Sequence, residues 1–135
     1  MTQPDTITLA RRLLAGIGEG QPADVIAALF SDDVQFEIPG DDGVLPWIGH
    51  RTGRQAVVDF VSATRALLEP LSFDVEDIAA SDTRAVIVGE LASRIRATDK
   101  VVETAFAIIL TVAGERIARF QMLENSFAVS LAARA

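Results

Sequence analysis

The amino-acid sequence predicts an α+β fold, in which helices come first along the chain and an antiparallel sheet follows. Two observations support this order. In the first half, apolar residues recur at the spacing of amphipathic helices, whereas from Leu71 onward long apolar runs alternate with short polar turns. Short turns between long strands are typical of an antiparallel meander. The chain has no internal repeat or linker, so we expect one domain over residues 1–135.

Two helices are expected before residue 34. Residues 6–18 place four apolar side chains on one helical face: Ala10, Leu13, Leu14 and Ile17. Pro22 suits the first position of a second helix, and Asp24 suits the positive end of its dipole. The inward face of this helix is predicted to hold Val25, Ile26, Leu29 and Phe30, and residues 31–33 are expected to end it.

A short strand and the third helix follow. We expect a strand over 34–38, a loop over 39–43, and a glycine-containing turn before the helix. The apolar stripe of this helix consists of Val57, Phe60, Val61, Thr64 and Leu68. Pro70 cannot continue a helix and is therefore predicted to stop it.

Four long strands complete the prediction. They cover residues 71–79, 84–97, 101–112 and 115–129, with turns at 81–83, 98–100 and 113–115. The strand over 101–112 is apolar on both sides, because Phe106 and Ile108 alternate with Ala107 and Ile109. A solvent-facing antiparallel strand would alternate apolar with polar residues. We therefore expect the helices to cover one face of the sheet and a second subunit to cover the other, which makes a homodimer.

Composition excludes several classes of function. The net charge of −7 argues against a nucleic-acid partner, because binding phosphates requires a basic face. The chain has no cysteine and one histidine, so we expect no metal site. The glycines within 16–20 end a helix and do not follow a strand, so no cofactor is expected either. No segment approaches the length of a membrane span, and no apolar leader is apparent near residue 1. A cytoplasmic protein without a membrane partner is the resulting expectation.

Three segments carry a resemblance to a known family: LFSDDVQFEIPG, the turn GHRTGR before an AVVDFV helix, and the closing GERIARFQMLENSFAV. With them the chain resembles the SnoaL-like proteins, of the nuclear transport factor 2-like superfamily that also contains ketosteroid isomerase. The resemblance implies a curved antiparallel sheet wrapped around the N-terminal helices, a cone-shaped, cystatin-like roll with a pocket at its open end. Members bind small, largely apolar ligands. Some isomerise steroids, close polyketide rings or hydrolyse epoxides, and others are non-catalytic binding or assembly domains.

The chain departs from the family's acidic positions. In the isomerase pattern an Asp precedes the Pro after the first strand, and here Ile38 precedes Pro39. Alignment of the closing strand puts Met122 and Asn125 where many relatives have Glu and Asp. Glu124 is then the remaining carboxylate on a mostly apolar strand face. If that face lines the pocket, Glu124 is a candidate acid or base; if the opposite face does, Asn125 is a candidate hydrogen-bond donor.

Each candidate also has a reading without catalysis. Glu124 can instead lie at a sheet edge or in an intersubunit ion pair. His50, which belongs to the turn before the third helix, is either a proton carrier at the pocket rim or simply exposed. Trp47 either covers the pocket or plugs the open end of the core. Glu90, on the strand over 84–97, is a further candidate to assist Glu124.

The sequence therefore supports two hypotheses. The first is a cofactor-independent acid/base enzyme of the isomerase, cyclase or epoxide-hydrolase type, which acts on a small hydrophobic carbonyl or epoxide compound. Its apolar wall would consist of Phe36, Trp47, Phe60, Phe106, Phe120 and Met122. The alternative is a non-catalytic domain of the same fold that binds a small ligand or serves dimerisation.

Overall fold

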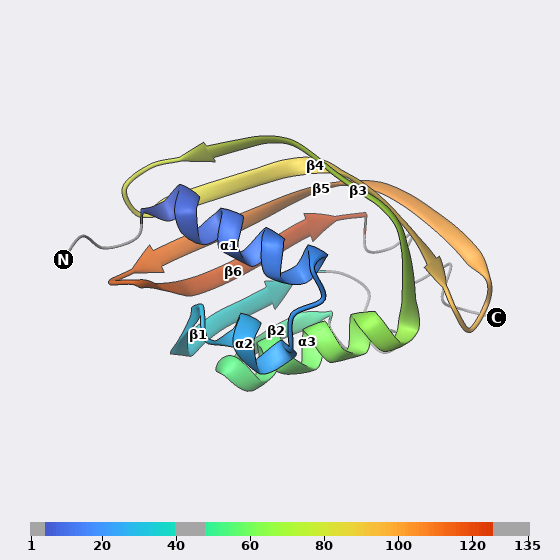
Figure 1. Cartoon of the computed structure of the whole chain (residues 1–135), viewed down its shortest axis with the longest axis horizontal. Helices are drawn as coiled ribbons and strands as arrows, with labels where there is room; N and C mark the ends of the chain where they lie inside the picture. Colours follow the sequence, from blue (N-terminus) through green and yellow to red (C-terminus); the bar gives the residue numbers. More distant parts are fainter. Residues whose placement is uncertain (1–4, 40–47, 126–135) are drawn as a thin grey trace.

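The computed structural model describes residues 5–39 and 48–125. Its elements are α1 (Thr6–Gly18), α2 (Ala23–Ala27), β1 (Phe30–Ile38), β2 (Gly49–Thr52), α3 (Arg54–Leu67), β3 (Leu68–Ala80), β4 (Arg84–Ile95), β5 (Lys100–Ala113) and β6 (Arg116–Glu124). Figure 1 shows a curved sheet with the helices on its inner side. The predicted α+β fold, with helices followed by long strands, is confirmed.

Within the described ranges, the strands form one sheet in the order β2-β1-β6-β5-β4-β3. Strands β3 to β6 are antiparallel neighbours, as predicted, but β1 lies parallel to β6. Parallel neighbours require a long connection, which here includes α3 and four strands. The predicted antiparallel meander of four long strands is confirmed, and β1 makes the sheet as a whole mixed. Hydrophobic periodicity gives the faces of a strand and not its distant neighbours, so the sequence did not indicate this pair.

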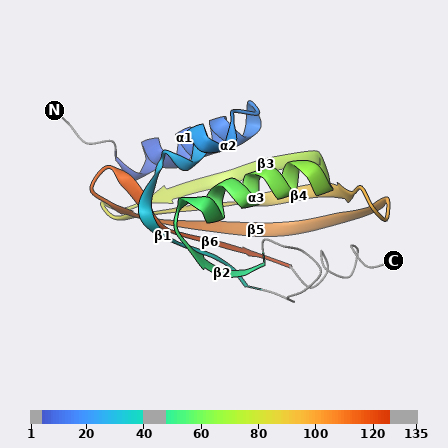
Figure 2. The ribbon, with the colours of Figure 1, turned by 90° about the horizontal axis from the view of Figure 1, so that it is seen from below.

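The core lies between the sheet and the helices. Figure 2 shows α1 and α3 on the same side of the sheet, with α1 over β3 to β5 and α3 nearer β1 and β2. The strands turn alternate side chains toward these helices, and the largest buried ones include Phe30, Val34, Ile38, Ile87, Leu110 and Ile117. Side chains of the helices thus cover one face of the central strands.

Helix α1 begins and ends where its sequence indicates. Asp5 caps the helix, since its carboxylate accepts a hydrogen bond of 2.8 Å from the backbone N–H of Thr8. The buried Thr6 donates its hydroxyl to the carbonyl of Ser81 at 2.6 Å, which attaches α1 to the turn between β3 and β4.

Within the ranges described, none of the helices has both the length and the apolarity that crossing a membrane requires.

Strand β2 occupies residues for which the sequence predicted only a turn. It pairs with β1, and Arg51 joins it to α3 through a 2.7 Å ion pair with Asp59. Hydrogen bonds from Gln55 and from Arg51 hold the pKa of the Asp59 carboxyl below its usual range. Gly53 then begins α3 with a φ of 101°, a backbone conformation that favours glycine.

The other boundaries differ from prediction by a few residues. Helix α2 ends at Ala27, and residues 30–33 open β1 rather than closing the helix. Helix α3 gives way to β3 at Leu68, shortly before the predicted stop at Pro70. The described part of the last strand ends at Glu124, and the predicted extension to residue 129 lies outside the described residues.

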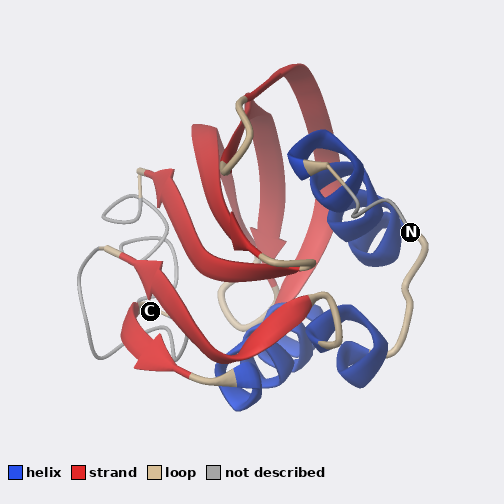
Figure 3. Cartoon of the chain, turned by 90° about the vertical axis from the view of Figure 1, so that its left-hand side faces the viewer, coloured by secondary structure: helices blue, strands red, loops and turns tan. Residues whose placement is uncertain are grey.

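The sheet bends sharply where β3 meets β4. The β3–β4 register shifts between Pro70 and Ser72 and again between Val75 and Asp77, so extra residues of β3 bulge at both places. Gly89 lies opposite Val75, and a Cβ at this position would overlap the carbonyl oxygen of Asp74. A glycine there lets the two backbones approach, and the end view in Figure 3 shows the resulting curvature.

Candidate functional site

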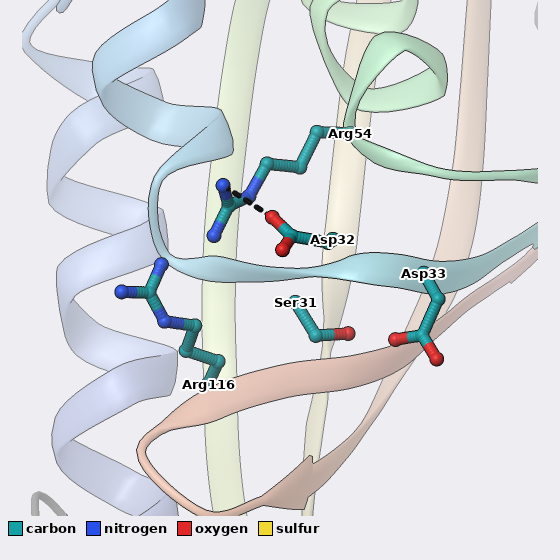
Figure 4. A pocket seen from close by; sticks show the side chains of 5 residues that line it. All are labelled: Ser31, Asp32, Asp33, Arg54 and Arg116. Atoms are coloured by element: carbon teal, nitrogen blue, oxygen red, sulfur yellow. Dashed lines mark ion pairs between the residues drawn. The ribbon is translucent and has the colours of Figure 1, made fainter.

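Two hollows stand out among the described residues, and they differ in chemistry. The larger is an open polar cleft of about 620 Å³, lined by Ser31, Asp32, Asp33, Arg54 and Arg116 (Figure 4). It forms where β1 leaves β6, because the β1–β6 register shifts between Phe30 and Gln35. The smaller is an apolar cavity of about 70 Å³ beneath α3.

The two arginine side chains of the cleft bind other groups of the protein. Arg54 makes a 2.7 Å ion pair with Asp32, visible in Figure 4, and its Nε donates to the carbonyl of Phe30 at 2.8 Å. Arg116 donates to the carbonyl of Ala28 at 3.2 Å. These bonds attach the start of α3 and the end of the β5–β6 hairpin to the connection between α2 and β1. The cleft therefore functions as a structural junction.

One polar atom at this junction remains without a partner. Ser31 Oγ is buried and makes no hydrogen bond to the described residues. The cleft around it is wide and holds both charges, so nothing there selects a ligand of one sign. The smaller cavity is therefore the better candidate for a ligand site.

The cavity beneath α3 is enclosed by five elements. Helix α3 forms one wall, β3 and β4 a second, and β5 with β6 the floor. Its lining consists of Phe60, Thr64, Leu68, Leu91, Ser93, Ile95, Val102, Met122 and Glu124. Six of these nine residues are aliphatic or aromatic, which makes the environment apolar, as in most small-molecule sites.

Glu124 is the single ionisable group in this lining. It follows Met122 on the inner face of β6, and neither an ion pair nor a hydrogen bond to its carboxylate occurs in the described part of the chain. Burial raises the pKa of the Glu124 carboxyl above its ordinary value, because desolvation disfavours the charged form. A carboxyl group in such an environment can act as a general acid or a general base toward a bound molecule.

The structure brings three of the predicted site residues together at the cavity: Phe60, Met122 and Glu124. Phe36 and Phe120 lie behind Phe60, where their rings stack with centroids 4.6 Å apart and planes inclined by 3°. The ring of Phe60 contacts both, at centroid distances of 5.2 and 6.1 Å. These aromatic rings hold the α3 wall against the sheet, and each such pair contributes about 1 kcal/mol beyond its buried area.

Phe106 occupies a different part of the core. It pairs with Glu124 across β5 and β6, but its ring stacks on Phe73 of β3 with centroids 4.7 Å apart. Phe106 is buried, whereas 46% of Phe73 is exposed. The pair therefore lies at the sheet bend and not in the cavity lining.

The other predicted polar residues lie away from the cavity. His50 pairs with Glu37, whose neighbours Phe36 and Ile38 point into the core, so His50 belongs to the outer sheet face and is exposed. Glu90 follows the buried Gly89 and is exposed on the same outer face.

Asn125 and Trp47 complete the predicted set. Asn125 is exposed just after β6, and its backbone N–H donates to Thr104 Oγ1 at 3.0 Å. Trp47 lies outside the described residues. The roles predicted for both stay predictions.

Sequence reasoning missed two hydroxyl residues of the lining, Thr64 and Ser93. Thr64 was placed in the apolar stripe of its helix, and Ser93 was not singled out. A signal for Ser93 was present, because it alternates with Leu91 and Ile95 and so belongs to the inner row of β4. That this serine lines a cavity becomes apparent only when the position of α3 above the row is known.

Comparison with known proteins places this architecture in a family. The family model of the SnoaL-like domain matches residues 10–120. Searching the curated proteins gave no match. An NTF2-like protein from Burkholderia xenovorans is similar in structure, with 19% identity, 99% of each chain covered and a TM-score of 0.85.

Two further solved structures share the fold. A protein with a ketosteroid isomerase-like fold from Catenulispora acidiphila, in complex with trimethylamine, has 17% identity and a TM-score of 0.73, over 95% of this chain and 91% of that one. A protein from Mesorhizobium loti named as a SnoaL-like polyketide cyclase has 15% identity and a TM-score of 0.69, over 84% of this chain and 94% of that one. Identities this low show a common fold, and the matched family model goes further: the chain belongs to the SnoaL-like domain family, with an NTF2-like fold.

Proposed function

We propose that this chain is a cofactor-independent acid/base enzyme, which acts on a small hydrophobic carbonyl or epoxide compound in the cavity beneath α3. The observation that carries the proposal is the uncompensated carboxyl group of Glu124 in an apolar lining. Burying such a group is unfavourable for the fold, and perturbed carboxyl groups in cavities are enriched at functional sites. Family neighbours named as isomerases and as polyketide cyclases agree with this class of chemistry.

Glu124 is the proton carrier in this proposal. As a carboxylate it removes a proton from carbon next to a carbonyl, and as the neutral acid it returns that proton or protonates an epoxide oxygen. Its raised pKa favours the neutral acid and makes the carboxylate a stronger base than that of an exposed glutamate. The proposal gives His50 and Glu90 no contact with the ligand, because both lie on the outer face.

The size of the cavity limits the ligand. At about 30 Å³ for each water molecule, a volume of about 70 Å³ has room for about two of them. Most sites for drug-sized ligands measure about 300 to 1,000 Å³. We therefore expect a ligand of more than a few non-hydrogen atoms to bind only when the space between α3 and the sheet widens.

Exchange of carbon-bound hydrogen tests the proposal without knowledge of the natural substrate. Cyclohexanone in D₂O is the probe, and proton NMR follows the loss of its α-hydrogen signals. We expect the protein to accelerate this exchange and Glu124→Gln to reduce the acceleration by about 100-fold or more. Glu103→Gln, on the outer face of β5, is the matched control and should leave the rate unchanged. Equal rates for Glu124→Gln and the unmodified protein would refute the acid/base role.

A second candidate, non-catalytic binding, is favoured by one specific observation. The Glu124 carboxylate lacks a cation among the described residues, and the ring of Phe60 borders the same cavity. A small alkylammonium ion would supply the missing charge and lie against the aromatic ring. The trimethylamine in the Catenulispora acidiphila complex suggests the probe.

The pH dependence separates the two candidates. Trimethylammonium requires the carboxylate, so its affinity should rise as pH increases through the pKa of Glu124. No other titratable side chain belongs to the described lining, so Glu124→Gln should abolish both the pH dependence and most of the affinity. Calorimetry that shows no binding at any pH would remove this candidate.

A homodimer and a cytoplasmic location are the remaining parts of the proposal. The outer face of the central strands carries a small apolar row, Ala105, Ala107 and Ile109, beside Leu123, which is 43% exposed. We propose that a second copy of the chain covers this row. Sedimentation should show a dimer that Ile109→Glu dissociates. A monomer at micromolar concentration would contradict the dimer. Cell fractionation tests the proposed cytoplasmic location.

A further inference from the structure

Among the described residues, one hydroxyl group in the cavity beneath α3 makes no hydrogen bond. The inference drawn from it rests on the proposed function of this site and deepens it. Three polar side chains of the described residues line the cavity: Thr64, Ser93 and Glu124. The Thr64 hydroxyl is committed to its own helix, since its Oγ1 lies 2.9 Å from the carbonyl of Phe60 and 3.1 Å from that of Val61. The Ser93 hydroxyl makes no hydrogen bond to the described residues.

Ser93 and Glu124 line the same cavity from the strands on either side of β5. Ser93 pairs with Val102 and Glu124 with Phe106, so two strand spacings and four residues along β5 separate them. In a flat sheet their Cα atoms would be about 16 Å apart. The sheet is curved (Figure 3), so the direct Cα–Cα distance is shorter than in a flat sheet, and no hydrogen bond joins the two groups within the described residues. Each group is therefore available to a molecule that lies between them.

We infer that Ser93 is the second polar contact for the ligand and donates a hydrogen bond to a ligand oxygen remote from Glu124. The ligand class follows from this arrangement. It is a small, mainly apolar molecule with two functional ends, a reacting group at Glu124 and a carbonyl, ether or hydroxyl oxygen at Ser93. The apolar residues between them, such as Leu91, Val102 and Met122, contact its carbon skeleton.

A pair of probes with the same shape measures this contact. The first is 1,4-cyclohexanedione, and the second is 4-methylenecyclohexanone, in which a CH₂ group replaces one carbonyl oxygen. The ratio of their affinities, from NMR chemical-shift titration, reports the second hydrogen bond. We expect Ser93→Ala to lower the preference for the dione by about 2- to 10-fold, the range for one neutral hydrogen bond. Ser93→Thr keeps a hydroxyl and should retain the preference.

The control removes a hydroxyl from the other face of the same region. Ser72 pairs with Ala92, the neighbour of Ser93, and therefore points away from the cavity. Ser72→Ala should leave the affinity ratio unchanged. A structural role for Ser93 would change both affinities equally, whereas a ligand contact changes their ratio.

The outcomes separate this inference from the proposed function. An unchanged ratio in Ser93→Ala, together with lost hydrogen exchange in Glu124→Gln, overturns the inference and leaves the acid/base role standing. A changed ratio with normal exchange in Glu124→Gln supports the inference and overturns the acid/base role. Unmodified protein that binds neither probe at millimolar concentration overturns both.

Discussion

Substitution of Gly89 by alanine tests the origin of the sheet curvature that shapes the cavity. A Cβ at this position would overlap the carbonyl oxygen of Asp74, and it would lie 3.0 Å from both the Asp74 carbonyl carbon and Phe106 Cζ. The obstacle is backbone on one side and a buried ring on the other, so neither can yield by a simple rotamer change. Relief requires β3 to move away from β4.

The cost follows from the contacts that such a movement breaks. Separation at Val75 removes about two backbone hydrogen bonds, each contributing about 1 kcal/mol. Displacement of Phe106 disturbs its stacking on Phe73, which adds about 1 kcal/mol. We therefore expect Gly89→Ala to lower the free energy of unfolding by about 3 kcal/mol and Tm by about 10 °C.

Urea unfolding with a matched glycine control checks this expectation. Gly18 is the last residue of α1, and a Cβ there meets no heavy atom within 4 Å. Gly18→Ala should stabilise the protein by about 0.5 kcal/mol, because alanine restricts the unfolded chain. If Gly89→Ala unfolded within about 0.5 kcal/mol of the unmodified protein, the close approach of β3 would not be the reason for glycine at this position.

Three further predictions concern the junction, the cavity and the core. Arg54→Met should lower the free energy of unfolding by about 1–2 kcal/mol, because it removes a hydrogen bond to a backbone carbonyl. Arg51→Met removes only an exposed ion pair and should change the free energy of unfolding by less than about 0.5 kcal/mol. Similar losses for both variants in denaturant titrations would contradict the structural role of the cleft. Glu124→Gln should be more stable than the unmodified protein at pH 8 and equally stable below pH 4.5. The reason is that the raised pKa of Glu124 makes the unmodified protein lose stability as pH increases through that pKa. A difference in the free energy of unfolding that narrows with increasing pH would indicate a partner for the carboxylate. Phe120→Ala should cost about 3–5 kcal/mol, and Phe73→Ala, half exposed, much less, as measured by thermal unfolding.

The helices illustrate how much of the fold the sequence predicted. The spacing of Leu13 and Ile17 indicated α1, and its predicted range of 6–18 agrees with the structure. The turns before Arg84 and Arg116 were also located, because glycine and short polar residues favour turns wherever they occur. These features depend on neighbours in sequence, and such neighbours are visible without a structure.

The candidate site was predicted only in part. Phe60, Met122 and Glu124 were selected for their residue types and strand or helix faces, and the structure brings them to one cavity. His50 was chosen because histidine titrates near neutral pH, but residue type does not reveal that its edge strand turns it outward. Ser93 was overlooked because serine is common and rarely functional.

The sequence by itself determined most of the helices and strands and the apolar face of the long strands, because these patterns repeat over a few residues. Only the tertiary structure decided that β1 lies parallel to β6 and that β3 bends at Gly89. It also decided that Glu124 and Ser93 share a cavity beneath α3. The physical reason is that a burial pattern records whether a side chain meets an apolar surface, whereas the identity of that surface depends on contacts between residues far apart in the chain.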